Sequence, residues 1–224
     1  MYFIYLAIII LIPIYAQMKV KSTYKKYSKV SASSGMNGAE TARAILDQNG
    51  LFNVRVEETP GMLSDHYDPR DKTVRLSTEN YHGHSVAGVA VAAHEVGHAI
   101  QDKEAYAFLR FRHALVPVAN FGSNISWILI LIGMLASIPG LLLAGIVFMA
   151  AAVLFQVITL PVEFNASSRA MDQLVSAGVI RNDEERETKK VLSAAAMTYV
   201  AAALVAVLEL VRLLLMYTGM REED

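Results

Sequence analysis

The stretch SVAGVAVAAHEVGHAIQDK, residues 85–103, predicts the helix around which this chain is organised. Its first half is apolar on every side, which is typical of a buried helix. His98 follows His94 by four residues, so both imidazoles project from one face of the helix, one turn apart. Glu95 stands beside the first imidazole. The stretch therefore predicts a buried helix that presents two imidazoles and a carboxylate together.

This H-E-x-x-H pattern matches a known zinc chemistry and also has a simpler explanation. His94 and His98 would bind zinc, which lowers the pKa of a water towards about 7. Glu95 would act as the general base and then pass the proton to the leaving amine. The alternative is a pair of histidines on the polar face of a solvated helix. The apolar neighbours and Gly97, which lets another segment approach closely, favour the metal site.

The composition is that of a membrane protein with a polar globular part. Of the 224 residues, 54% are hydrophobic and only 18% are charged, with a mean hydropathy of +0.36. Soluble domains carry about 25% charged residues. The net charge of -1 provides no general basic field, so nucleic acid is not an expected partner. Because the chain has no cysteine, disulfides are excluded and any metal site must use histidine and carboxylate ligands.

Several apolar segments are expected to cross the membrane. Residues 2–18 are nearly long enough to span, and lysines follow rather than precede them, which favours an uncleaved anchor over a cleaved signal peptide. Residues 127–160 carry no charge. Residues 191–217 are apolar except for Glu209 and Arg212, which lie three residues apart and can pair. The expected spans are residues 2–18, 115–137, 140–160 and 191–217.

The uncharged region before residue 161 is expected to form a hairpin. As one helix, residues 127–160 would extend roughly 50 Å, well beyond a hydrocarbon core of about 30 Å. A turn at residues 137–140, which include a Pro-Gly pair, brings Glu163 back to the side of the two histidines. No other carboxylate lies within residues 105–171, so Glu163 is the best candidate for a third zinc ligand. A solvated glutamate at the membrane interface is the alternative.

The distribution of positive charge predicts the orientation. Of the 20 lysines and arginines, 13 lie in residues 19–112 and 5 in residues 169–190. The positive-inside rule places both regions in the cytoplasm, with both termini and the hairpin tip outside. We therefore expect a multi-pass protein of the cell membrane whose active site faces the cytoplasm. The lysines of residues 19–29 are expected to bind anionic lipid headgroups of the bilayer.

The polar segment after the first span predicts short helices and strands. Asn37 and Glu40 form a capping-box pattern, which begins a helix that should run to about Gln48 and stop at Gly50. Alternating polarity then predicts strands, and residues 77–84 read as a short connector. The expected strands are residues 53–58, 62–67 and 72–77, the last two joined by a turn at residues 68–71.

Further side chains are candidates for stabilising a developing oxyanion or binding substrate. Arg169 is the most interesting, because it follows Glu163 by six residues on an expected helix. His66 lies in the expected hairpin, whose exposed edge can bind an extended peptide by strand addition. Each candidate also has a simpler structural explanation. The set is His66, His82, His84, Tyr106 and Arg169.

Several longer motifs make the chain resemble a known family. It resembles the neutral zinc metallopeptidases of bacterial membranes, the YugP type, and more distantly the membrane peptidases of the HtpX type. The matching stretches are KSTYKKYSKV at 21–30, GAETARAILDQNGL at 38–51, DHYDPRDKTVRLS at 65–77, VAAHEVGHAIQ at 91–101, LVPVANFGS at 115–123 and LPVEFNASSRA at 160–170.

The resemblance implies that His94, His98 and Glu163 bind zinc and that Glu95 is the base. Two positions depart from the expected pattern. HtpX-type sequences have aspartate where this chain has Ser167, and family members often have aspartate where it has Asn165. A carboxylate that would orient a ligand histidine is therefore either missing or supplied from elsewhere.

The expected fold is a mainly α membrane protein with about four transmembrane helices and a small α+β, zincin-like cytoplasmic catalytic part containing a short β-sheet. The expected function is a zinc endopeptidase acting on peptides or membrane proteins. A non-catalytic scaffold stapled by zinc and a zinc amide hydrolase with a non-peptide substrate are the alternatives. The expected segments are an anchor at 1–18, a catalytic part at 19–113, a transmembrane hairpin at 114–160, a cytoplasmic segment with the third ligand at 161–190 and a C-terminal helix and tail at 191–224.

Overall fold

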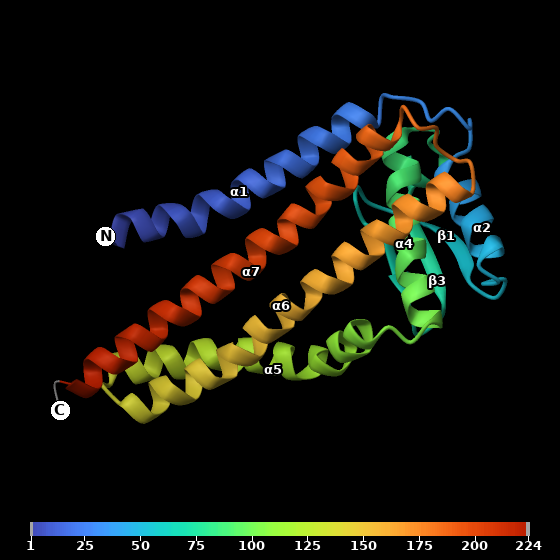
Figure 1. Cartoon of the computed structure of the whole chain (residues 1–224). Helices are drawn as coiled ribbons and strands as arrows, with labels where there is room; N and C mark the ends of the chain where they lie inside the picture. Colours follow the sequence, from blue (N-terminus) through green and yellow to red (C-terminus); the bar gives the residue numbers. More distant parts are fainter. Residues whose placement is uncertain (1, 223–224) are drawn as a thin grey trace. The chain divides into compact units, whose positions relative to one another are not determined.

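A computed structural model describes residues 2–222, which form helices and one small sheet (Figure 1). The fold class is as expected, a mainly α protein with a short sheet. The elements in chain order are α1 (Tyr2–Tyr27), α2 (Gly38–Gln48), β1 (Arg55–Thr59), β2 (His66–Asp68), β3 (Thr73–Ser77), α3 (Thr78–His82), α4 (Val86–Lys103), α5 (Ala107–Leu135), α6 (Pro139–Ser176) and α7 (Glu185–Glu222).

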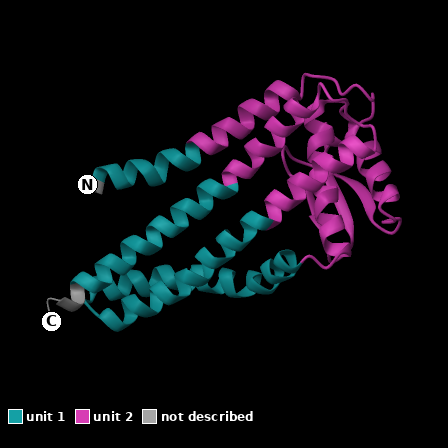
Figure 2. Cartoon of the chain, viewed as in Figure 1, with its two compact units in different colours: residues 1–14, 107–161, 199–224 teal, residues 15–106, 162–198 magenta. Residues whose placement is uncertain are grey.

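The chain divides into two compact units (Figure 2). Unit 1 contains residues 1–14, 107–161 and 199–224, and unit 2 contains residues 15–106 and 162–198. Three long helices, α1, α6 and α7, therefore contribute residues to both units. The sheet and α4 belong entirely to unit 2.

Four of the described helices are long and apolar enough to cross a membrane. The candidate spans are Phe3–Tyr27, Ala107–Leu135, Pro139–Ser176 and Glu185–Gly219. They extend past the predicted segments, because the helices continue into polar sequence after residues 18 and 160, and Pro161 lies inside α6 without ending it. Helix α6 ends only before Gly178, whose φ of 65° lies in the left-handed region that favours glycine.

The predicted hairpin is present in unit 1. Helix α5 ends at Leu135 and α6 begins at Pro139, and the Ile138 amide donates to the Gly133 carbonyl at 2.9 Å. A Cβ at Gly133 would lie 2.5 Å from the Leu142 nitrogen, so glycine permits the close approach of the two helices there. The hairpin packs around the buried side chains of Ile130 and Leu142.

A polar contact joins α1 to α7 within unit 1. The guanidinium of Arg212 donates to the carboxylate of Glu209 through Nε at 3.1 Å and also through Nη2, as expected from their spacing. The hydroxyl of Tyr5 donates to the same carboxylate. Arg212 also lies over the Tyr5 ring, 5.7 Å from its centroid. Two charged side chains of an apolar helix are thus paired with each other and with a phenol.

In unit 2, a three-stranded sheet has the order β1-β3-β2. Strand β3 pairs parallel with β1 and antiparallel with β2, which confirms the predicted hairpin. The first strand of that hairpin was predicted too long, because β2 covers only residues 66–68 rather than 62–67. The predicted capping box is also present: Asn37 Oδ1 accepts from the Glu40 amide, and Glu40 Oε2 accepts from the Asn37 amide. Where a connector was expected, residues 78–82 form the short helix α3.

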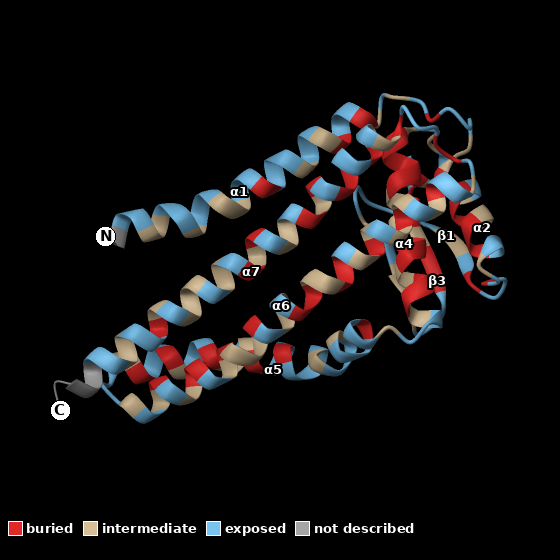
Figure 3. Ribbon diagram, viewed as in Figure 1, coloured by how far each residue is buried: buried red, intermediate tan, exposed pale blue. Residues whose placement is uncertain are grey.

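The core of unit 2 surrounds α4, which is buried over most of its length (Figure 3). Ser85 caps this helix by accepting from the Gly88 amide at 3.0 Å. Helices α2 and α4 pack on each other and on the sheet. The same core includes Tyr24 and Tyr27 from the last turns of α1. The metal-motif helix is therefore the centre of the core, as its apolar first half predicts.

Candidate metal centre

The candidate site forms where α4 and α6 make close contact in unit 2. A Cβ built at Gly97 of α4 would come within 2.7 Å of the Ala166 carbonyl oxygen of α6. Only glycine allows the two backbones to approach this closely. This contact places Glu163, one turn before Ala166, opposite the histidine face of α4.

His94, His98 and Glu163 converge, with one ligand atom from each lying within 4.8 Å of the others. Glu163 Oε2 lies 3.2 Å from His94 Nε2 and 3.6 Å from His98 Nε2. The two imidazole rings are nearly perpendicular, at 86°, with centroids 4.8 Å apart. The Glu163 side chain is only 2% exposed, so its carboxylate is directed into the protein rather than into water.

These separations fit a tetrahedral ion. Two ligands about 2.1 Å from such an ion lie about 3.4 Å apart, and the observed distances of 3.2 and 3.6 Å bracket that value. Two imidazoles and one carboxylate are also a ligand set typical of catalytic zinc, which leaves one position open. The residues present therefore fit a zinc ion.

The electrostatics of the site suit a cation. Burial disfavours the charged imidazolium of His98, but the carboxylates of Glu163 and Glu95 outweigh it, so the pKa of His98 is raised. Glu95 is itself only 8% exposed. A metal ion would take the place of this proton, because a histidine ligand must be neutral.

The Nδ1 atom of each histidine, on the side of the ring away from Glu163, contacts an uncharged oxygen atom. His98 Nδ1 lies 3.0 Å from Gln101 Oε1, and His94 Nδ1 lies 3.2 Å from Ser167 Oγ. The resemblance led us to expect a carboxylate behind a ligand histidine, and the hydroxyl of Ser167 makes this contact to His94 instead. Contacts of this kind fix the tautomer and orientation of a ligand imidazole.

Gln101 also ties the two helices together. Its amide group is fully buried, and Nε2 donates to the Val162 carbonyl at 2.8 Å and to Asn165 Oδ1 at 2.9 Å. Sequence analysis missed Gln101. The available signal was its spacing, because it follows His98 by three residues on the same helix face. Asn165, the other departure from the family pattern, accepts this hydrogen bond.

Arg169 lies beside the site but does not contact the ligand histidines in the contacts described. Its Nη2 pairs with Glu104 at 2.6 Å, and its Nε donates to Asn165 Oδ1 at 2.7 Å. Asn165 Oδ1 thus accepts hydrogen bonds from both Gln101 and Arg169. Its predicted role toward substrate stays a prediction.

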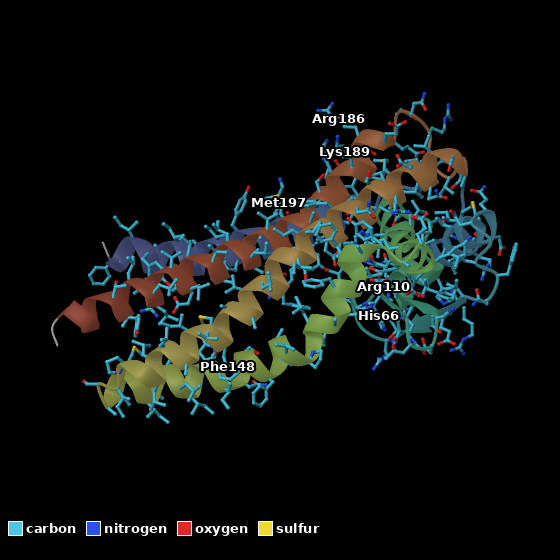
Figure 4. All side chains as sticks on the ribbon, turned by 60° about the horizontal axis from the view of Figure 1, so that its bottom comes forward. His66, Arg110, Phe148, Arg186, Lys189 and Met197 are labelled. Atoms are coloured by element: carbon cyan, nitrogen blue, oxygen red, sulfur yellow. The ribbon has the colours of Figure 1, made fainter. Side chains whose placement is uncertain are left out.

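The remaining candidates lie elsewhere in unit 2. His66 belongs to the edge strand β2, is exposed, and contacts the Ser64 carbonyl through Nδ1 at 2.8 Å (Figure 4). His82 contacts Glu58 at 3.2 Å and His84 contacts the Gly35 carbonyl at 2.7 Å. The amide of Tyr106 donates to the Gln101 carbonyl just beyond α4. Among the described residues, His94, His98 and Glu163 form the group that is close enough to hold a metal ion.

Comparisons with known proteins identify the family of the chain. The family described as "Putative neutral zinc metallopeptidase" matches residues 2–218. The chain is 55% identical over 225 residues to "Putative membrane protease YugP" of Bacillus subtilis (strain 168), with all of both chains covered. No solved structure matches the chain. This membrane protein therefore belongs to the neutral zinc metallopeptidase family.

Proposed function

We propose that the protein is a membrane-integrated zinc endopeptidase in which Glu95 is the general base. One observation carries the proposal: the Nε2 atoms of His94 and His98 meet the Glu163 carboxylate at the spacing of zinc ligands, with Glu95 next in sequence to His94. The family and the name of the Bacillus relative support the same class of activity.

In this proposal each side chain has a separate task. His94, His98 and Glu163 hold zinc, and Gln101 and Ser167 orient the two imidazoles. When bound, zinc supplies Lewis-acid polarisation of the peptide carbonyl and activation of a water. The carboxylate of Glu95 would accept a proton from the attacking water and pass it to the leaving amine. A buried carboxylate suits this work, because exclusion of water strengthens its electrostatic interactions.

We further propose that the four long helices cross the cell membrane and that the site faces the cytoplasm. The positive charges of residues 19–112 and 169–190 support this orientation. Substrates would then be peptides or membrane proteins near the inner surface. The outer edge of β2, which carries His66 and lacks a neighbouring strand in the described sheet, is the surface we assign to an extended substrate segment.

Glu95→Gln tests the mechanism. The variant should keep one zinc per chain and lose cleavage of a peptide library by at least about 100-fold, as expected when a general base is removed. Glu185→Gln, a change of the same chemistry in the first turn of α7, should behave as wild type.

Unchanged proteolysis in Glu95→Gln would rule out the mechanism. A silent Glu95→Gln combined with unfolding of His94→Ala would instead support a zinc-stapled scaffold. Cleavage of lipid or cell-wall amides but of no peptide would identify an amide hydrolase of another specificity.

A further inference from the structure

A cavity of about 490 Å³ lies between α1 and α7 in unit 2, apart from the metal centre. Its volume is within the range of small-ligand sites, roughly 300–1,000 Å³. The lining residues are Lys19, Ser22, Thr23, Lys26 and Tyr27 of α1 and Lys190, Ser193, Ala194 and Met197 of α7.

The two helices contribute matching stripes of side chains. On α1 the cavity residues other than Tyr27 fall at positions 19, 22, 23 and 26, and on α7 they fall at positions 190, 193, 194 and 197. Each set follows the i, i+3, i+4, i+7 spacing of one helix face. The cavity is thus built by two continuous faces opposite each other, rather than by scattered surface residues.

The charge of the cavity is entirely positive. Lys19, Lys26 and Lys190 line it, and none of its lining residues is acidic. The ammonium of Lys26 lies 5.2 Å from the centroid of the Tyr27 ring. None of the ion pairs described for residues 2–222 involves these three lysines. An anion is therefore the complementary ligand.

The wall beside the lysines is largely apolar. The side chains of Tyr27, Ala194 and Met197 border the cavity, and the hydroxyls of Thr23 and Ser193 are hydrogen-bonding groups next to them. Ser22 already donates to the Lys19 carbonyl at 3.1 Å. A ligand that satisfies this surface combines an anionic head with an apolar body.

The cavity lies where both helices change from apolar to polar sequence. Lys19 directly follows the apolar residues 2–18, and Lys190 directly precedes the apolar residues 191–208. Figure 4 shows Arg186 and Lys189 at the beginning of α7 and Met197 further along the same helix. In a membrane this is the level of the lipid headgroups.

We propose that the cavity binds one anionic phospholipid of the surrounding leaflet. Its phosphate contacts Lys19, Lys26 and Lys190, and its glycerol backbone and first methylenes lie against Ala194 and Met197. The site differs from general attraction between basic residues and the membrane surface, because it uses selected lysines from two helices. It does not depend on the proposed peptidase activity.

Two triple variants of equal charge test the proposal. Lys19→Gln/Lys26→Gln/Lys190→Gln removes the cavity lysines, and Lys21→Gln/Lys25→Gln/Lys189→Gln removes three exposed lysines of the same helices that do not line it. Binding is measured by native mass spectrometry of the full chain, titrated with phosphatidylglycerol or phosphatidylcholine. Thermal unfolding of each variant checks that it is folded.

We expect the cavity variant to bind phosphatidylglycerol roughly 10- to 100-fold more weakly, since it loses the direct, charge-assisted contacts of three ammonium groups with the phosphate. The control variant should stay within about twofold of wild type, and phosphatidylcholine should bind weakly to all three. Ser193→Asp, which puts a carboxylate in the cavity, should weaken phosphatidylglycerol binding without removing any lysine.

Equal losses in the two triple variants would overturn the proposal in favour of general surface charge. Equal binding of phosphatidylcholine and phosphatidylglycerol by wild type would also overturn it. Displacement of the lipid by soluble glycerol phosphate at matched concentration would show a free-phosphate site instead, because the apolar wall would then contribute nothing.

Discussion

Gly97 of α4 lies against the Ala166 carbonyl of α6, leaving no room for a Cβ. Gly97→Ala should force the helices apart, separate Glu163 from the histidines, and reduce both zinc content and stability, the latter by about 1–3 kcal/mol. Metal analysis and thermal unfolding measure the two effects. Gly140→Ala on α6, where a Cβ meets no atom within 4 Å, is the control and should retain zinc. A fully zinc-loaded Gly97→Ala protein would show that this contact does not set the ligand geometry.

The side-chain oxygen of Gln101 contacts Nδ1 of His98. Gln101→Met removes this contact, so it should weaken zinc binding while leaving all three ligands in place. The expected loss of affinity is about 10- to 100-fold, typical for removing a group that orients a ligand imidazole. Competition with a chromophoric chelator measures the affinity directly. Gln48→Met on α2, an exposed glutamine, should have no effect. If the two variants bind zinc equally, Gln101 serves only to pack α4 against α6.

The contact among Tyr5, Glu209 and Arg212 predicts a non-additive pair of substitutions. Glu209→Leu leaves the guanidinium without its carboxylate and should destabilise the protein by on the order of 1–3 kcal/mol. The double variant Glu209→Leu/Arg212→Leu should be less destabilised than Glu209→Leu alone, because no unpaired charge remains. Thermal unfolding in detergent micelles gives both values. Additive losses in the double variant would mean that the two charges do not interact.

Glu184 predicts an acid-sensitive contact in unit 2. Burial raises the pKa of its carboxyl, but hydrogen bonds from Ser33 and from the Arg181 amide outweigh it, so the pKa is lowered overall. The stabilisation is therefore complete above the unfolded-state pKa of about 4.3 and is lost as the pH falls through the lower folded-state value.

This acid sensitivity is measured as the difference in melting temperature between wild type and Glu184→Gln. The difference should be largest near pH 6 and should shrink as the pH is lowered below about 4. Glu185→Gln, the neighbouring change of the same chemistry, should show no such trend. A difference that is independent of pH would indicate that Glu184 acts through packing alone.

The main elements were predictable because each has a local signal. The spacing of His94 and His98 defines a helix face, Asn37 and Glu40 form a capping box, and the Pro139-Gly140 pair marks the hairpin turn. Glu163 was chosen as a ligand candidate because no other carboxylate lies within residues 105–171. The structure brings its side chain to the histidines.

The rest depends on the approach of distant segments, which no local pattern encodes. Ser167 and the second set of Gln101 contacts become meaningful only when α6 lies beside α4, because Ser167 meets His94 and the Gln101 amide meets Val162 and Asn165 on the facing helix; only the contact of Gln101 with His98 is local. The bounds of the long helices were underestimated for a related reason. Hydropathy marks where a segment turns polar, whereas a helix continues until a residue such as Gly178 stops it.

The last turns of α1 belong to the core of unit 2, so the polar part of the chain cannot be cut away from α1 without loss of core residues. Tyr24 and Tyr27 are buried there, and the Tyr24 hydroxyl donates to Asn80, whose amide donates in turn to Asp65. A cut that freed the polar part from its first helix would open this core. A fragment that lacks these turns of α1 is therefore not expected to keep the packing around α4 that brings the metal-ligand candidates together.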